Sequence, residues 1–240
     1  MSLNAALLLI GSELIRGGTS GSVDENRQFL ADELRTAGVN IASVHVVRDD
    51  VDSIADLVRF LSSRVAYLIT AGGLGPTLDD VTLEAVARAF GLPLVTQEPM
   101  GPDDYARMSG SETLQPQLRH FPDGAEVIST AHGPVVRTGN VYSLPGLPRL
   151  VKARFSAILE RFGGSVIQAC TLTVAVPQSL VASALERASG RYPSVSIGCH
   201  PSSNPLDGTT LLFEGRSADE LHACVTFVKL SLNAGDETGA

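Results

Sequence analysis

Apolar runs and segments of helical periodicity alternate along the chain as far as Gly91. The runs at residues 5–10 and 65–69 have the apolar character of buried strands, and the run at residues 39–47 is β-branched and partly alternating. Each run is followed by apolar residues at the spacing of one helix face, of which Ile54, Val58 and Leu61 are an example. This β-α-β-α-β-α order predicts a parallel sheet with helices on both of its faces.

The pattern changes beyond the third predicted helix. Residues 99–121 show little periodicity, and we interpret them as a long excursion beside the functional site. Short strands follow, and Pro148 suits the first turn of a further helix that ends at Gly163-Gly164. After this break, the order strand, helix, strand, strand, helix is typical of a small α+β domain. We therefore predict one domain at residues 1–165 and a second at residues 166–240.

The segment between the third predicted strand and its helix carries the most specific chemistry. It contains three glycines and two acids, namely Gly72, Gly73, Gly75, Asp79 and Asp80. Glycines allow positive φ and a close approach of the backbone to a ligand, and backbone N–H groups ahead of a helix favour a phosphate. Two carboxylates beside a phosphate are favourable if a hard divalent cation lies between them. The alternative is a tight strand-to-helix turn with solvated acids, since the segment is neither a dinucleotide-binding fingerprint nor a Walker A loop.

Polar residues that follow the first two predicted strands are further candidates. Glu13 follows the first strand and Asp49 the second, and in open α/β sheets the loops after the carboxyl ends of strands build the ligand crevice. Asn26 lies in the first turn of the intervening helix, where it either faces this crevice or is solvated. Position alone leaves Glu13 equally consistent with a surface acid. Asp50 or Asp52 is instead predicted to cap the helix after the second strand.

The composition narrows the class of partner. The chain has 18 Lys and Arg against 26 Asp and Glu, and the net charge of −8 argues against a surface that binds nucleic acid or an anionic membrane. The three cysteines, Cys170, Cys199 and Cys224, are too far apart in sequence for a disulfide framework or a zinc site. The apolar run at residues 7–10 is too short to span a bilayer, and we expect no signal peptide. We therefore expect a cytoplasmic protein.

The glycine and aspartate motif at residues 72–82 resembles the signature of the competence/damage-inducible CinA family, whose amino-terminal domain is molybdopterin-binding-like and of the MoaB/MogA type. The resemblance extends to residues 10–14, to Asn26 and to residues 140–148. Residues 192–201 are similar to part of the molybdopterin-binding-like module of eukaryotic FAD synthases. The sequence departs from the molybdopterin enzymes at Leu74, where they carry Thr, and we expect neither the carboxy-terminal amidase of CinA proteins nor a synthase domain.

The resemblance implies a three-layer α/β/α domain with a mostly parallel sheet, the molybdopterin-binding-like fold, followed by a small α+β carboxy-terminal domain. It implies a hydrolase acting on phosphoric anhydride bonds, a metal-dependent nucleotide pyrophosphatase that cleaves a dinucleotide such as FAD or ADP-ribose. Two alternatives remain open. One is a molybdopterin-binding or adenylyl-transfer protein of molybdenum-cofactor biosynthesis, and the other is a non-catalytic nucleotide-binding module.

These expectations assign roles to individual residues. The candidate catalytic residues are Asp80, Asp49 and Glu13, of which Glu13 or Asp49 would accept the proton of a water molecule. The candidate ligands of a divalent metal, Mg²⁺, Mn²⁺ or Co²⁺, are Asp80, Asp49 and Asp79. The predicted contacts of the bound nucleotide or pterin are Gly72, Gly73, Gly75, Pro76, Thr77, Asn26, Pro145 and Gly146. We also expect a homo-oligomer.

Overall fold

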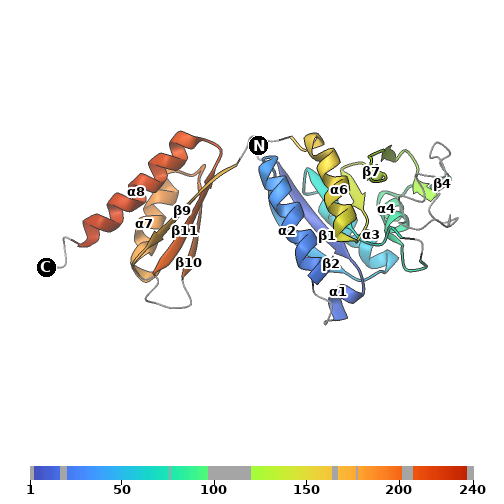
Figure 1. Ribbon diagram of the computed structural model, residues 1–240, viewed down its shortest axis with the longest axis horizontal. Coiled ribbons are helices and arrows are strands. Elements are labelled where there is room, and N and C mark those ends of the chain that lie inside the picture. Colours follow the sequence, from blue (N-terminus) through green and yellow to red (C-terminus); the bar gives the residue numbers. More distant parts are fainter. Residues whose placement is uncertain are drawn as a thin grey trace. The chain divides into compact units, whose positions relative to one another are not determined.

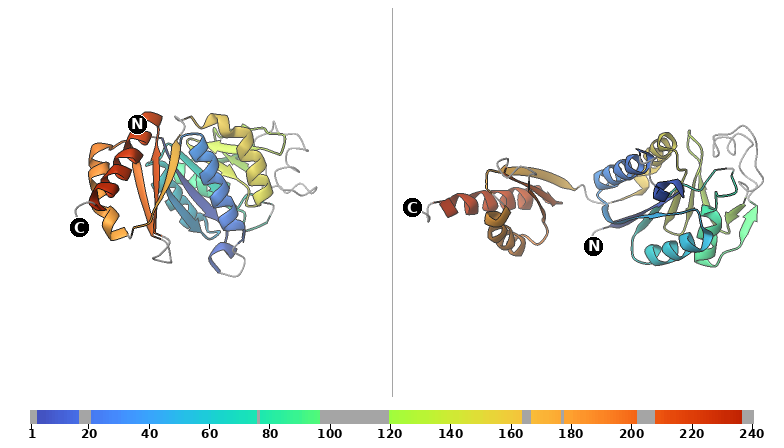
Figure 2. Two further views of the ribbon diagram at one scale, coloured as in Figure 1. Left: turned by 60° about the vertical axis from the view of Figure 1, so that its left-hand side comes forward. Right: turned by 90° about the horizontal axis from the view of Figure 1, so that it is seen from below.

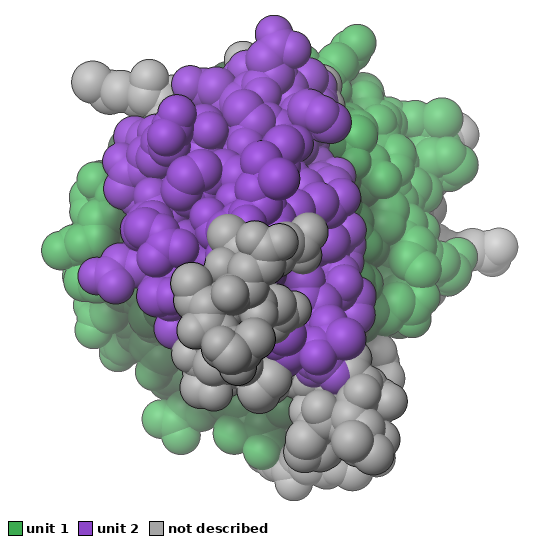
Figure 3. All heavy atoms as spheres, turned by 90° about the vertical axis from the view of Figure 1, so that its left-hand side faces the viewer, with its two compact units in different colours: residues 1–164 green, residues 165–240 purple. Residues whose placement is uncertain are grey.

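The computed structural model divides into two compact units, shown by colour in Figure 3, with unit 1 at residues 1–164 and unit 2 at residues 165–240. The residues that the structure describes are 3–16, 21–75, 77–96, 120–163, 167–176, 178–201 and 208–236. The boundary expected from sequence falls after residue 165, next to this division.

Unit 1 contains a six-stranded sheet in the order β2-β1-β3-β8-β7-β6 (Figure 1). The strands are β1 (Asn4–Ile10), β2 (Asn40–Val47), β3 (Tyr67–Ala71), β6 (Glu126–Ile128), β7 (Val135–Thr138) and β8 (Val141–Leu144). The first four in the sheet order are parallel, while β7 and β6 run antiparallel to their neighbours. The predicted mostly parallel sheet is therefore confirmed.

Helices cover both faces of this sheet (Figure 2). On one face lie α2 (Gly21–Thr36) and α6 (Pro148–Ile158), and on the other lie α3 (Val51–Ser62) and α4 (Thr82–Phe90). Successive side chains of a strand point to opposite faces, so Leu7 and Leu9 of β1 belong to the first core whereas Leu8 belongs to the second. All three are buried. The three-layer α/β/α architecture expected from the sequence is confirmed.

The ends of three helices follow the local signals in the sequence. The carboxylate of Asp50 accepts the Ser53 N–H at 2.9 Å and caps α3, so Asp50, and not Asp52, performs the predicted capping role. The left-handed conformation of Gly91, with φ of 67°, ends α4. Pro148 occupies the first turn of α6, which is followed by the short 3-10 helix η2 (Leu159–Arg161).

Two features of unit 1 differ from the sequence pattern or extend it. A one-turn helix, α1 (Glu13–Arg16), follows β1 where we expect a loop, so Glu13 begins a helix. A two-stranded antiparallel sheet joins β4 (Leu94–Thr96) to β5 (His120–Pro122). Most of the excursion expected at residues 99–121 lies outside the described residues.

Unit 2 is the small α+β domain that the pattern predicts. Its antiparallel sheet has the order β10-β11-β9, with β9 at Gln168–Val174, β10 at Ser196–Pro201 and β11 at Thr209–Gly215. The helices α7 (Gln178–Arg191) and α8 (Ala218–Asp236) cover one face of this sheet, and the core between them contains Phe213 and Val228. No helix in the described parts of either unit is long and apolar enough to cross a membrane.

Candidate functional site

A pocket of about 360 Å³ lies in unit 1 at the carboxyl ends of the four parallel strands. Each of these strands contributes the residues that follow it. Gly11 comes after β1, Asp49 after β2, Gly72 after β3 and Pro145 after β8. This is the edge at which open parallel sheets bind ligands, because all the connecting loops meet there.

The turn after β3 is held by the chain itself. The Gly72 N–H donates to the Leu144 carbonyl at 3.0 Å, and the Thr82 hydroxyl donates to the Gly72 carbonyl at 2.8 Å. Gly72 and Gly73 have φ of 118° and 62°, and a Cβ atom at these positions would come within 1.9 Å of the Ile10 carbonyl oxygen and 2.3 Å of the Thr82 hydroxyl, respectively. The positive φ expected from the sequence is therefore confirmed, and packing within the chain excludes a side chain at both positions.

The same turn offers hydrogen-bond donors to the pocket. Gly73, Leu74 and Gly75 all line it. Within the part of the chain that the structure describes, their backbone N–H groups donate to no protein acceptor. Successive unpaired N–H groups at the edge of a cavity are a favourable environment for an anion. Pro76, predicted to contact the ligand, lies outside the described residues.

Asp80 is oriented by Thr77, which does not line the pocket itself. The N–H and the hydroxyl of Thr77 both donate to Asp80 Oδ2, at 2.8 and 2.5 Å. A Cβ atom on Gly75 would lie 2.5 Å from this same oxygen, so the absence of a side chain at Gly75 leaves room for the carboxylate. Hydrogen bonding by the Thr77 side chain also holds the pKa of the neighbouring Asp79 carboxyl below its ordinary value. Thr77 thus acts on both acids of the motif.

Asp49 is oriented from the neighbouring strand end. The Ser12 N–H donates to Asp49 Oδ2 at 2.6 Å, and the Asp49 N–H donates to the Ser12 hydroxyl oxygen at 3.3 Å. These two bonds join the segments that follow β1 and β2. Glu13 lines the pocket beside them, and its carboxylate lies against Gly11, where a Cβ atom would come within 2.5 Å of Glu13 Oε1. Sequence reasoning did not single out Ser12, because its partner is 37 positions away.

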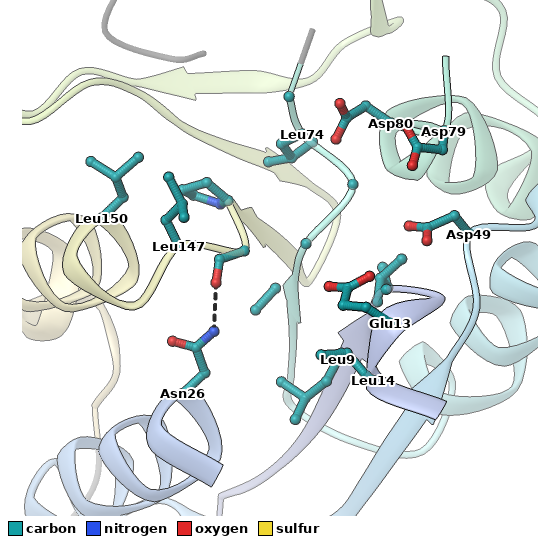
Figure 4. A pocket seen from close by; sticks show the side chains of 18 of the residues that line it. Leu9, Glu13, Leu14, Asn26, Asp49, Leu74, Asp79, Asp80, Leu147 and Leu150 are labelled. Carbon is teal, nitrogen blue, oxygen red and sulfur yellow. Dashed lines mark hydrogen bonds between the residues drawn. The ribbon is translucent and has the colours of Figure 1, made fainter. Parts of the chain in front are cut away.

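The opposite side of the pocket is apolar apart from one amide. Figure 4 shows the carboxylates of Asp80, Asp79, Asp49 and Glu13 along one side, and Asn26, Leu147 and Leu150 across from them. Asn26 is 5% exposed, and its side-chain N–H₂ group donates to the Gly146 carbonyl at 2.8 Å. This bond links α2 to the segment between β8 and α6. The leucines were not predicted, since apolar residues in a cleft look like core residues in a sequence.

The donor set fits a hydrated divalent ion better than a fully coordinated one. Asp49 and Asp80 each have one carboxylate oxygen engaged by backbone and hydroxyl groups. The described residues hold no group of three or more His, Cys, Asp or Glu placed to bind a metal ion. Mg²⁺ commonly takes only one or two carboxylates and completes its shell with water and substrate phosphates. The acids of the pocket fit that mode of binding, in which water and a bound phosphate would complete the coordination.

Two families match successive parts of the chain. Residues 6–163 match the family described as "Probable molybdopterin binding domain", and residues 167–238 match "FAD synthase, middle domain". The division between these matches agrees with the division between the two compact units.

Individual proteins are also similar to this chain in sequence. A protein of Aeropyrum pernix is 32% identical over 91% of this chain and 88% of its own length. A CinA-like protein of Frankia casuarinae is 33% identical over 76% of this chain and 47% of its own length, and a probable FAD synthase of Caenorhabditis elegans is 29% identical over 94% and 49%. The chain thus spans about half the length of the latter two relatives.

One solved structure is also similar to this chain. The crystal structure of the protein CinA from Thermoplasma acidophilum, whose function is described as unknown, matches with a TM-score of 0.56 and 26% identity, covering 67% of this chain and 98% of that one. Together the matches confirm the resemblance to CinA proteins and FAD synthases that the motifs indicate.

Proposed function

Because the chain belongs to the probable molybdopterin binding domain family, we propose that its pocket binds a dinucleotide pyrophosphate such as FAD or ADP-ribose and hydrolyses it with the help of a divalent metal. One observation carries the proposal. Gly73, Leu74 and Gly75, whose N–H groups are unpaired in the described chain, line the same pocket as four carboxylates. A phosphate would accept hydrogen bonds from the N–H groups but would be repelled by the carboxylates. A metal ion between the phosphate and the carboxylates would remove that repulsion.

The size of the repulsion explains why a cation belongs here. Two unit charges 4 Å apart repel by about 4 kcal/mol at an effective dielectric constant of 20. Asp79 and Asp80 lie on the segment that follows the glycine turn, and both line the pocket together with it. A divalent ion bound by Asp80, Asp79 or Asp49 would offset the charge of the phosphates and favour the ionised form of a bound water.

Different residues of the chain have different roles in the proposed hydrolysis. The N–H groups of the turn hold phosphate oxygens and fix the pyrophosphate against the end of β3. Ser12 and Thr77 hold one oxygen of Asp49 and of Asp80, respectively, which fixes the direction of the other. Glu13 or Asp49 accepts the proton of the attacking water, as both lie in the pocket.

The test is product analysis with the purified chain. FAD, ADP-ribose, NAD and ATP are each incubated with a chelator, Mg²⁺, Mn²⁺ or Co²⁺. The proposal expects AMP and FMN from FAD, or AMP and ribose 5-phosphate from ADP-ribose, in the presence of metal only. In a further incubation, molybdopterin is added to ATP, and an adenylylated pterin with release of pyrophosphate would instead identify an adenylyl-transfer protein of molybdenum-cofactor biosynthesis.

A second candidate is a nucleotide-binding module without catalytic activity. It is favoured by the lack, among the described residues, of a group of three or more side chains that could bind a metal by themselves. This candidate expects calorimetric binding of a nucleotide and no products under any of the metal conditions above.

A further inference from the structure

We propose that strand β9 of unit 2 pairs in antiparallel fashion with β9 of a second copy of this chain, so that the three-stranded sheets of two copies join into one continuous sheet. This contact lies in unit 2 and uses none of the pocket residues, so it is independent of the proposed hydrolysis. The observation behind it is an edge strand whose outer backbone groups have no partner within the described chain.

The strand β9 lies at one edge of the sheet order β10-β11-β9 (Figure 1). Its seven residues, Gln168–Val174, include no charged side chain and no proline, and they pair with β11 in continuous register. Among the described residues, no segment other than β11 makes a backbone hydrogen bond to this strand. An exposed, regular and uncharged edge strand is a template for pairing with another chain.

The other edge strands of the two larger sheets differ from β9. The strand β10 ends in Pro201, which has no N–H to donate. The register of β2 with β1 shifts once, as at a bulge. The strand β6 is only three residues long, and its Glu126 forms ion pairs with Arg137 and Arg161. Proline, bulges, charges and short length are the features that block such pairing, and β9 has none of them in the part of the chain that the structure describes.

The direction of the backbone groups of β9 follows from its last residue. A Cβ atom on Gly208, just before β11, would lie 2.1 Å from the Val174 carbonyl oxygen, so this oxygen points toward β11. Because the backbone groups of successive residues alternate in direction along an antiparallel strand, those of Ala169, Thr171 and Thr173 point away from β11. All three residues are exposed. They therefore form the free edge of the sheet.

This free edge is complementary to itself in one register. When Thr171 of one copy lies opposite Thr171 of the other, Ala169 of each copy lies opposite Thr173 of its neighbour. Each of these pairs exchanges two hydrogen bonds, so about six form across the contact. The pairing brings no like charges together, which favours it in a chain whose net charge is −8. The symmetry of the free groups favours a second copy over an unrelated peptide as the partner.

The side chains on the helix-covered face of β9 also favour this contact. Cys170 and Leu172 pack against the core of unit 2 but are only partly buried, whereas Leu211 and Phe213 of the central strand are 0% exposed. In the proposed register, Cys170 lies opposite Leu172 of the second copy. Pairing would therefore cover apolar surface at the open end of this core. The contact is small, so we expect a dimer that dissociates reversibly.

Sedimentation of the full chain from micromolar to millimolar concentration tests the contact. Thr171→Pro removes an outward N–H and leaves the bonds between β9 and β11, so unit 2 should stay folded while dimerisation weakens about tenfold or more. Thr171→Val is the matched control, because it keeps the N–H and the branched shape, and it should dimerise like wild type. Hydrogen exchange of peptides from β11 checks that unit 2 is folded in each variant.

Disulfide cross-linking tests the register. Leu172→Cys places a thiol opposite Cys170 of the second copy, at a Cα separation of about 4.5 Å that suits a disulfide. The Cys170 residues of two wild-type copies would be diagonal neighbours, roughly 7–8 Å apart, which is too far for a disulfide. Ala169→Cys is the control, since it adds a more exposed thiol on the opposite face of the same strand. Under mild oxidation with copper phenanthroline, Leu172→Cys should form a covalent dimer, and wild type and Ala169→Cys should not.

Each possible result supports or overturns the contact. A wild-type chain that stays monomeric at millimolar concentration would overturn it and leave the edge of β9 to a different partner. Dimerisation that is unchanged in a folded Thr171→Pro, or cross-linking of Ala169→Cys as efficient as that of Leu172→Cys, would also overturn it. Cross-linking decides the matter if Thr171→Pro does not fold. None of these measurements depends on nucleotide binding or hydrolysis.

Discussion

The two units pack helices against a sheet in similar ways, yet the pocket that gathers the polar motifs lies in unit 1. In unit 1, the parallel strands β2, β1, β3 and β8 all end at one edge, so four connecting segments meet there. In unit 2, the three strands are antiparallel, and successive strands end at opposite edges. The lesson is topological, because convergence of strand ends places residues that are far apart in sequence around one cavity.

The glycines repeat this contrast on a smaller scale. Gly72 of unit 1 has φ of 118°, and a Cβ atom there would come within 1.9 Å of the Ile10 carbonyl oxygen. Gly215 of unit 2 ends β11, and the nearest atom to its added Cβ would be 3.5 Å away, on the Val195 side chain. The first glycine is required by its surroundings, and the second is not.

The largest expected effect comes from Gly72→Ala. A side chain at this φ, in contact with a backbone carbonyl, should destabilise unit 1 by about 4 kcal/mol or more. Gly215→Ala should change the stability of unit 2 by less than about 1 kcal/mol. Chemical unfolding of the full chain, followed by hydrogen exchange of peptides from each unit, measures both. Similar small losses for the two variants would show that the turn after β3 is not constrained as the structure indicates.

The sequence predicted the elements of unit 1 but not the contacts that constrain the turn after β3. The strands, the helices, the Asp50 cap and the Gly91 end follow from periodicity and local chemistry, which act over a few residues. The motif at residues 72–82 indicated a site because its glycines and acids are adjacent in sequence. The positive φ expected at Gly72 is confirmed, but its packing against Ile10 was not predicted, since Ile10 lies on another strand.

Long-range hydrogen bonds account for the rest. Ser12 and Asp49 are 37 positions apart, and Asn26 and Gly146 are 120 positions apart. No periodicity or local propensity connects such pairs, and they meet only when the sheet order brings strand ends together. Resemblance to the CinA family named Asn26 and Gly146 separately, whereas the structure shows that they are joined. The one-turn helix at Glu13 was missed because four residues carry too weak a pattern.

Asp80→Asn should have the next largest effect, now on chemistry rather than on folding. With Mg²⁺, loss of an anionic ligand should lower turnover of the dinucleotide about a hundredfold or more. With a chelator, loss of a charge near the phosphates should leave nucleotide affinity unchanged or raise it. A capping role is excluded as the explanation, because the N-cap residue of α4 is Val81 and no side chain makes a capping hydrogen bond there.

The control for Asp80→Asn lies in the other unit. Asp219 is an exposed acid in the first turn of α8, and Asp219→Asn removes the same charge far from the pocket motifs in the sequence. It should leave turnover and its metal dependence as in wild type. If Asp80→Asn hydrolyses the dinucleotide as fast as Asp219→Asn in Mg²⁺, the metal-assisted mechanism is wrong and the binding module becomes the better proposal.

The smallest effect concerns the residue that orients Asp80. Thr77→Val keeps the N–H that donates to Asp80 Oδ2 but removes the hydroxyl that donates to the same oxygen at 2.5 Å. One of the two hydrogen bonds from Thr77 to this carboxylate is lost, so the metal concentration for half-maximal turnover should rise about tenfold. The affinity for the nucleotide in the presence of chelator should stay constant. Thr77→Ser restores the hydroxyl and should restore the wild-type metal dependence.

The matched change in unit 2 is Thr173→Val, which removes an exposed hydroxyl that lies 3.4 Å from that of Thr210, and it should leave the metal dependence of turnover unchanged. A general loss of stability in Thr77→Val would lower turnover at every metal concentration without moving the midpoint. A midpoint that does not move, or one that Thr77→Ser fails to restore, would show that the Thr77 hydroxyl does not position Asp80 for a metal.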